Sequence, residues 1–323
     1  MSNVDDFWGA RRFLVTGGTG FLGRTICKKL EQLGASEVIA PRSRDFDLTR
    51  PDDVEKLFAD ATPDIVIHAA ARVGGIGFNQ ARPAELYLSN LLMGTFVIDE
   101  ARKREIEKTV ILGTICAYPK YAPVPFSEDD LWEGYPEETN AAYGIAKKVL
   151  LVQAQANRQQ FGQSCIYLLP VNLYGPGDKF HPSVSHVIPA LIKKFVEAKE
   201  KGESKVEVWG SGRATREFLY VEDAGDGILA ATRHFDSPEP VNLGSGREIS
   251  IGDLAELIRG LVGFDGELIW DPDKPDGQPR RRLDTRRART EFGWKAQMPL
   301  EDGLKTTIDW YLAHRAEAEV PPT

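Results

Sequence analysis

Short apolar runs alternate with longer amphipathic segments through the first half of this 323-residue chain. The apolar runs are rich in Val, Ile and Leu, which is typical of buried strands. We predict strands over residues 12–16, 37–40, 64–68 and 109–113, and helices over residues 23–33, 51–59 and 86–103. Strands and helices that alternate in short units predict an α/β fold, in which helices cover both faces of a parallel sheet.

The pattern changes after about Pro170. Residues 175–185 are rich in Gly, Pro and Ser, and we predict a loop there and over residues 271–279. Further helices are predicted over 187–201, 251–262 and 300–316, and strands over 205–209 and 241–243. The strand at 241–243 is a candidate to return to the first sheet, so the boundary near Pro170 need not divide the chain into two consecutive domains.

Charge and composition exclude several classes of protein. Asp and Glu number 48 against 40 Lys and Arg, a net charge of −8, so the basic surface of a nucleic-acid-binding protein is missing. Acidic residues and Trp8 precede the first apolar run, unlike a signal peptide, and no apolar stretch approaches the ~20 residues of a membrane span. Three cysteines, an odd and sparse set, favour a reducing compartment. We expect a cytoplasmic protein without a membrane or nucleic-acid partner.

A glycine-rich loop lies between the first predicted strand and helix. One glycine of such a loop makes a tight turn, one lets the backbone approach a pyrophosphate, and one allows close packing of helix on strand. The pyrophosphate then meets the free N–H groups of a helix N-terminus. The alternative is a glycine-rich turn that binds nothing. The predicted cofactor-binding residues here are Gly17, Gly18, Thr19, Gly20, Phe21, Leu22 and Gly23.

The segment after the second strand bears on the choice of cofactor. NAD-specific sites usually place an acidic residue there, but Arg42 and Arg44 precede Asp45 in this chain. A guanidinium suits the 2′-phosphate of NADP, so we predict NADPH/NADP. Alternatively, the arginines are solvated and Asp45 binds the ribose. Asp47 and Leu48 are expected beside the adenine.

Tyr143 and Lys147 are spaced i, i+4, which puts both on one face of a helix. A phenol of pKa ~10 is a poor acid–base group at neutral pH, and a nearby ammonium is expected to lower that pKa. Thr114, at the end of the fourth strand, is placed to share a hydrogen bond with the oxygen that Tyr143 protonates. Alone this spacing is commonly chance, but here it follows a dinucleotide loop.

These features resemble the extended short-chain dehydrogenases/reductases. Longer stretches resemble, more specifically, the GDP-L-fucose synthases, which are GDP-4-keto-6-deoxy-mannose 3,5-epimerase-4-reductases. The matching stretches are residues 71–76 (ARVGGI), 112–120 (LGTICAYPK), 172–176 (NLYGP), 180–190 (FHPSVSHVIPA), 208–212 (VWGSG), 216–219 (REFL) and 274–277 (KPDG).

The resemblance implies a set of catalytic residues. Cys116 and His186 match the acid–base pair that inverts carbons 3 and 5 of the hexose, and Thr114 and Tyr143 match the groups that bond the carbon-4 oxygen. Alone, Cys116 would more often be a buried small hydrophobe, and His186 could cap the following helix. The implied catalytic set is Thr114, Cys116, Tyr143, Lys147 and His186, without a metal.

The resemblance also implies binding residues. A GDP-sugar would be held by Lys194, Trp209, Arg216 and Arg281, with both arginines on the diphosphate. Four family positions differ here: Thr114 replaces serine, Lys194 replaces arginine, Arg281 replaces lysine and Val171 replaces threonine. These changes keep the charge or catalytic chemistry and bear on which 4-keto sugar and nucleotide the site accepts. The further implied cofactor contacts are Ala69, Ala70, Ala71, Lys147, Pro170, Asn172, Leu173 and His186.

The resemblance further implies a Rossmann domain of residues 1–170 plus 220–244 and a smaller C-terminal α/β substrate domain of residues 171–219 plus 245–315. It implies a homodimer that pairs helices near residues 86–103 and 141–160. The expected activity is conversion of GDP-4-keto-6-deoxy-D-mannose to GDP-L-fucose. Two alternatives stay open: a related nucleotide-sugar reductase or 4-epimerase, and a non-catalytic redox-sensing module that binds NADP.

Overall fold

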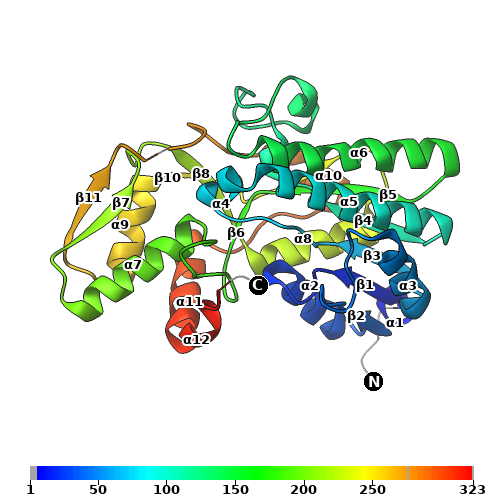
Figure 1. The fold of residues 1–323 in the computed structure, drawn as a ribbon, viewed down its shortest axis with the longest axis horizontal. Helices are drawn as coiled ribbons and strands as arrows, with labels where there is room; N and C mark the ends of the chain where they lie inside the picture. The colour runs from blue at the N-terminus through cyan, green and yellow to red at the C-terminus, as the bar shows by residue number, and fades with distance from the viewer. Residues whose placement is uncertain (1–5, 275, 322–323) are drawn as a thin grey trace.

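The computed structural model describes residues 6–274 and 276–321 (Figure 1). Residues 1–5, part of the segment compared with a signal peptide, and Pro275 of the 274–277 stretch therefore lie outside the described residues. The largest sheet has the strand order β2-β1-β3-β4-β5-β9, and all neighbouring strands run parallel. Its strands are β1 (Arg12–Thr16), β2 (Glu37–Ile39), β3 (Ile65–His68), β4 (Lys108–Leu112), β5 (Cys165–Pro170) and β9 (Val241–Leu243).

Helices cover both faces of this sheet, because successive strand residues are apolar and face opposite ways. Phe13 of β1 packs in the cluster that contains Ile26 of α2 and Ile228 of α8, whereas Leu14 packs in the cluster with Leu57 of α3. The predicted fold class, a doubly wound parallel sheet, is confirmed. The covering helices are α2 (Phe21–Gln32), α3 (Pro51–Ala61), α5 (Pro83–Lys103), α6 (Ala141–Phe161) and α8 (Val221–His234).

Strand order locates the place where a ligand is expected. The chain leaves β1 for β2 on one side and returns to β3 on the other. In open α/β sheets, ligands bind beyond the carboxyl ends of the strands at such a reversal. The short strand at Val241–Leu243 does return to this sheet, where it pairs with β5.

The later part of the chain builds a second, smaller core (Figure 1). Within the described residues, β6 (Asn172–Tyr174), β8 (Thr215–Tyr220) and β10 (Glu248–Ser250) form one small sheet, and β7 (Lys205–Trp209) and β11 (Glu267–Asp271) form a parallel pair. The domain boundaries stay a prediction. The helices of this part are α7 (Val187–Lys201), α9 (Ile251–Val262), α11 (Leu300–Ala313) and α12 (Arg315–Ala318).

Several predicted bounds need correction. The long helix predicted from residue 86 begins at Pro83, since proline suits the first turn of a helix. The single helix predicted over 300–316 is wrong: it ends at Ala313, because the backbone of His314 leaves helical angles, with φ −129° and ψ 30°. The helix α8 and the strands β5, β6, β8, β10 and β11 were not predicted. Nor were several short elements: α1 (Asp6–Gly9), α4 (Ile76–Ala81), η1 (Ile115–Ala117), η2 (Glu128–Trp132) and α10 (Arg286–Phe292).

Candidate active site

The glycine-rich loop brings the backbones of two strand ends into contact. Gly17 follows β1 with a φ of +73°, and a Cβ there would lie 2.7 Å from the amide nitrogen of Ala70, just beyond β3. A Cβ on Gly23 would lie 2.0 Å from the carbonyl oxygen of Gly17. Gly20 is the N-cap of α2 and supplies no capping side chain, so the first N–H groups of the helix stay available for an anion. This geometry fits a dinucleotide pyrophosphate.

The segment after β2 carries exposed charge. Arg42 and Arg44 are both exposed, and Arg44 forms only a loose ion pair with Asp45, at 3.5 Å. The carboxylate of Asp47 accepts hydrogen bonds from the amide and hydroxyl of Thr49, and these bonds lower its pKa. Leu48 is buried. Within the described residues, the Arg42 guanidinium has no ion-pair partner, which suits a phosphate.

Three of the predicted catalytic residues come together beyond the end of β4. The hydroxyl of Thr114 accepts a hydrogen bond from the amide of Cys116 at 3.2 Å and is hydrogen-bonded to the phenol of Tyr143. Helix α6 approaches η1 this closely because Gly144 has no side chain: a Cβ there would lie 2.2 Å from the carbonyl oxygen of Cys116. The phenol, hydroxyl and sulfur therefore surround one small volume.

The protonation of this group differs from the sequence prediction. Burial raises the pKa of Tyr143, the charge of Cys116 raises it further, and the Thr114 hydrogen bond only partly opposes this. The expectation that Lys147 lowers this pKa is wrong for the protein alone, because burial dominates and lowers the pKa of Lys147 itself to about 8. Tyr143 is therefore a protonated donor at neutral pH.

Polar atoms without protein partners lie close to Lys147. His68, fully buried at the end of β3, bonds the hydroxyl of Thr16 through Nδ1 at 2.8 Å, and its Nε2 has no partner. Burial and the charge of Lys147 lower the pKa of His68 well below its usual value. No acceptor within the described residues bonds Lys147 Nζ. Buried unpaired polar groups of this kind fit the ribose and nicotinamide end of a cofactor.

The remaining predicted cofactor contacts lie at neighbouring strand ends. Ala69, Ala70 and Ala71 follow β3. Pro170 ends β5, and Asn172 and Leu173 begin β6. The amide of Asn172 donates to the carbonyl of Glu217 at 2.9 Å, which fixes β6 against β8.

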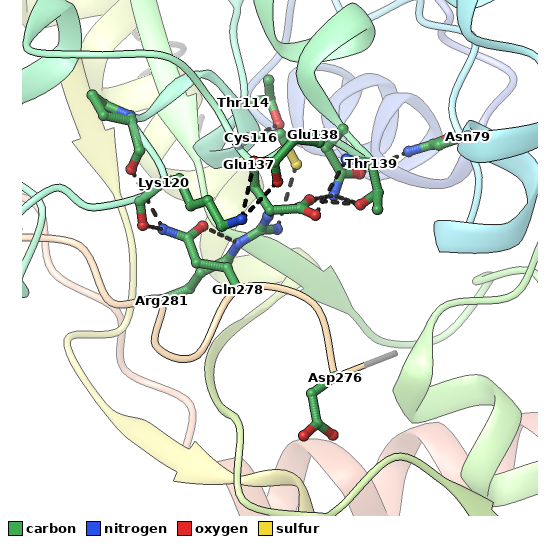
Figure 2. Close-up of polar contacts among 12 residues, drawn as sticks. Asn79, Thr114, Cys116, Lys120, Glu137, Glu138, Thr139, Asp276, Gln278 and Arg281 are labelled. Atoms are coloured by element: carbon green, nitrogen blue, oxygen red, sulfur yellow. Dashed lines mark hydrogen bonds and ion pairs between the residues drawn. The ribbon is translucent and has the colours of Figure 1, made fainter. Parts of the chain in front are cut away.

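The sulfur of Cys116 meets a guanidinium that the resemblance assigned elsewhere (Figure 2). Arg281 is 7% exposed and donates through Nη1 to Cys116 Sγ at 3.6 Å. Its Nε donates to Gln278 Oε1 at 2.8 Å, and its Nη2 lies 3.8 Å from a carboxylate oxygen of Glu137. Burial raises the pKa of Glu137, but the hydrogen bonds from Thr139 and Asn140 outweigh this and lower it.

His186 occupies the N-cap position of α7, but its side chain makes no capping bond, so the capping alternative fails. The residue is exposed, but desolvation by the surrounding protein atoms, and then the charge of Lys179, lower the pKa of the imidazole. No described contact joins His186 directly to Cys116. Its chain segment contacts the loop before α4, because a Cβ on Gly75 would lie 2.8 Å from the carbonyl oxygen of Ser185. The nearby His181 is hydrogen-bonded to the hydroxyl of Ser183.

The predicted substrate cations form two groups. Lys194 lies with its ammonium 5.5 Å from the ring centre of the exposed Trp209, and Lys274 lies 5.4 Å from that ring centre. Arg216 donates to the carbonyls of Thr215, Asp276 and Gln278. Burial, and then the charge of the neighbouring Arg281, lowers the pKa of Arg216 to about 10.

Comparison with known proteins decides the family. Residues 13–244 match the NAD dependent epimerase/dehydratase family. The chain belongs to this family. A family member from rice (Oryza sativa subsp. japonica), named probable GDP-L-fucose synthase 1, is 43% identical over 309 residues, which cover 95% of this chain and 94% of the relative. The resemblance seen in the sequence is confirmed.

Solved structures of epimerase/dehydratase proteins show the same architecture. A GDP-6-OMe-4-keto-L-xylo-heptose reductase from C. jejuni has a TM-score of 0.87 and 27% identity, with 93% of this chain and 97% of that chain covered. A GDP-L-fucose synthetase from Naegleria fowleri bound to NADP has a TM-score of 0.84 and 29% identity, with 95% and 96% covered.

Some residues of this epimerase/dehydratase site were not found in the sequence. Gln278 lies three residues before Arg281, and Glu137 comes from a distant segment that no spacing rule links to Arg281. Glu137 does lie six residues before Tyr143 in a segment that must lead into the catalytic helix, which is a weak signal. Among the described residues, no cluster of His, Cys, Asp and Glu is suited to bind a metal.

Proposed function

We propose that this protein is a GDP-L-fucose synthase: it converts GDP-4-keto-6-deoxy-D-mannose to GDP-L-fucose by inverting carbons 3 and 5 and reducing carbon 4 with NADPH. The observation that carries the proposal is the meeting of the Tyr143 phenol, the Thr114 hydroxyl and the Cys116 sulfur at the end of β4. The similarity to the rice synthase supports the choice of substrate.

The two inversions depend on the ketone at carbon 4, which acidifies the protons on carbons 3 and 5. Cys116 and His186 serve as the acid–base pair: one takes a proton from one face and the other returns a proton to the opposite face. The electron pair of the broken C–H bond moves onto the carbonyl oxygen. Tyr143 and Thr114 hydrogen-bond that oxygen as its charge grows, and the raised pKa of Tyr143 keeps its phenol a donor at neutral pH.

NADPH supplies the hydride that reduces carbon 4. The α2 N-terminus would bind its pyrophosphate, Arg42 and Arg44 its 2′-phosphate, and Lys147 the ribose beside the nicotinamide. Tyr143 then gives its proton to the new alkoxide on carbon 4. One pocket thus serves three steps, because each step acts through the same oxygen.

The sugar nucleotide would lie across the second, smaller core. Arg216 is proposed to meet the diphosphate, since a guanidinium fork matches phosphate oxygens. Trp209, between two ammonium groups, is proposed to pack against the base or ribose. We assign residues 1–170 plus 220–244 to cofactor binding and 171–219 plus 245–315 to substrate binding.

A cytoplasmic homodimer completes the proposal. Large apolar side chains on α5 and α6 are exposed: Leu88 is 54% and Val152 49% accessible. Two such helices from each subunit would bury these side chains. Among the described residues, no helix has both the length and the apolar character needed to traverse a bilayer.

The test is incubation with GDP-4-keto-6-deoxy-D-mannose and NADPH in deuterated water. We expect GDP-fucose that carries deuterium at carbons 3 and 5, together with oxidation of NADPH. NADPH oxidation without deuterium at those carbons would instead indicate a plain reductase, the activity that the C. jejuni structure is named for. A Cys116→Ser variant should lose deuterium incorporation by about a thousandfold while it still binds NADPH.

A further inference from the structure

Arg281 is oriented toward the catalytic sulfur. Resemblance assigns the residue to the substrate diphosphate, but its guanidinium is buried and bonds Cys116 Sγ at 3.6 Å. Its backbone amide also donates to the carbonyl of Thr215, so the main chain is fixed beside β8. In this position, the positive charge of the guanidinium lies beside the sulfur of Cys116.

Two buried partners hold that orientation (Figure 2). Gln278 is 4% exposed; its amide donates to the carbonyl of Lys120 at 2.7 Å, and its oxygen accepts from Arg281 Nε. Glu137 is 5% exposed and is fixed by hydrogen bonds from Thr139 and Asn140. Rotation of Arg281 toward a diphosphate would leave both partners buried without it, which is unfavourable.

We propose that Arg281 is a further catalytic residue of the proposed reaction, whose guanidinium stabilises the negative charge on Cys116 Sγ whenever the sulfur has given up its proton. Glu137 and Gln278 are positioning residues for it. The proposal rests on the proposed function for its place in catalysis, but the sulfur–guanidinium contact is a property of the protein alone.

The proton balance is the same in both directions. When the thiolate takes a proton, an S–H bond forms, a C–H bond of the sugar breaks, and the electron pair moves to the carbon-4 oxygen. When the thiol returns a proton to the sugar, the sulfur is left anionic. The sulfur is therefore charged on one side of each transfer. Arg281 transfers no proton to the sugar and only offsets that charge, at a separation where opposite charges interact strongly.

Arg216 offers a useful contrast. Its side-chain bonds run to main-chain carbonyls of Thr215, Asp276 and Gln278, and the side chain is only partly buried. Its charge is not neutralised by those carbonyls, so it stays free to attract a diphosphate. Of the two neighbouring arginines, Arg281 thus contacts the sulfur and Arg216 is available to the diphosphate.

The test measures the alkylation rate of Cys116 by iodoacetamide, which reacts with the thiolate. Peptide mass spectrometry separates the three cysteines, and the other two react slowly at pH 7 because burial raises the pKa of Cys27 to about 11 and that of Cys165 to about 12. In Arg281→Gln, alkylation of Cys116 at pH 7 should fall by about tenfold. The difference should vanish at strongly alkaline pH, where the thiol ionises without help.

Two further variants make the test specific. Arg281→Lys keeps a positive charge and should recover most of the rate. Arg280→Gln is the matched control, because Arg280 pairs with Glu248 at the surface, and it should leave the rate unchanged. NADPH binding by each variant shows that it is folded.

Unchanged alkylation in a folded Arg281→Gln variant, together with weaker binding of GDP, would overturn the proposal in favour of the diphosphate role. Because alkylation needs no sugar substrate, the measurement does not depend on the proposed function. If deuterium never enters carbons 3 and 5, the proposed function fails, whereas an alkylation rate that depends on Arg281 still establishes the effect on the sulfur.

Discussion

The two sides of Tyr143 are built differently. On the cofactor side, Lys147 Nζ bonds no acceptor among the described residues and His68 Nε2 is unpaired. On the sugar side, the buried groups of Glu137, Gln278 and Arg281 all bond one another or their neighbours. Buried polar groups normally find partners. The cofactor side therefore depends on a ligand for its missing bonds, while the sugar side is preassembled by the protein.

Adjacent residues of α6 show the same contrast. Lys147 and Lys148 are both 2% exposed. Lys148 donates to the carbonyl of Leu131 and lies 4.3 Å from the ring centre of Trp132, so its charge has partners. Lys147 faces the cofactor side and has none within the described residues. The two lysines are equally buried, but only Lys148 has partners in the protein. Lys148 therefore has a structural role, whereas Lys147 is available to a ligand.

The largest effect should come from Gly17→Ala, which disrupts the close backbone contact between the glycine-rich loop and Ala70 on the cofactor side. A Cβ would lie 2.7 Å from the main chain of Ala70, and φ is +73°. We expect a loss of about 4 kcal/mol in the free energy of unfolding, from the left-handed backbone plus the clash. Equilibrium denaturation measures it, and NADPH titration should show a matching loss of affinity.

The matched control for Gly17→Ala is Gly202→Ala. Gly202 ends α7 with a φ of +67° and has open space around it. The Gly202→Ala substitution causes only backbone strain and no clash, so we expect the free energy of unfolding to fall by about 1 kcal/mol. Equal losses at both glycines would mean that the close approach between the ends of β1 and β3 contributes nothing.

Sequence pattern predicted the elements and the cofactor side better than it predicted the sugar side. The dinucleotide loop is local, so glycine spacing alone located the contact at Gly17. Thr114 and Tyr143 were predicted to lie together, since each lies in a recognisable motif, and the structure brings them together. Of the partners of Arg281, Gln278 lies only three residues before it, whereas Glu137 comes from a distant segment that only tertiary packing brings to the guanidinium. The pKa of Tyr143 was predicted in the wrong direction, because burial depends on the whole fold.

An intermediate effect of opposite sign is expected from Lys147→Met. Below pH 8 the folded protein holds a buried, unpaired ammonium, so its removal should raise the free energy of unfolding of the cofactor-free protein by about 2 kcal/mol. Because the pKa of Lys147 is about 8 in the folded protein and 10.5 for an ordinary lysine, the gain should shrink as the pH rises from about 8 to 10.5. Denaturation at several pH values measures it.

Lys148→Met provides the control for Lys147→Met. It removes the donor to Leu131 and the contact with Trp132, so a loss of about 1 kcal/mol is expected. NADPH affinity should fall in Lys147→Met and not in Lys148→Met. Destabilisation by both substitutions would contradict the assignment of unpaired charge to the cofactor side.

The smallest effect should come from Arg42→Ala at the outer end of the cofactor side. The side chain is exposed, so stability should not change. Loss of one guanidinium from a 2′-phosphate is expected to weaken NADPH binding by about tenfold, or 1.4 kcal/mol, and to leave NADH binding unchanged. Titration with NADPH and with NADH measures the ratio of the two affinities. Arg50→Ala, an exposed arginine at the N-cap of α3, is the control and should preserve it. If Arg42→Ala weakens NADPH and NADH binding equally, then the arginine does not read the phosphate and Asp45 becomes the residue to test against the ribose.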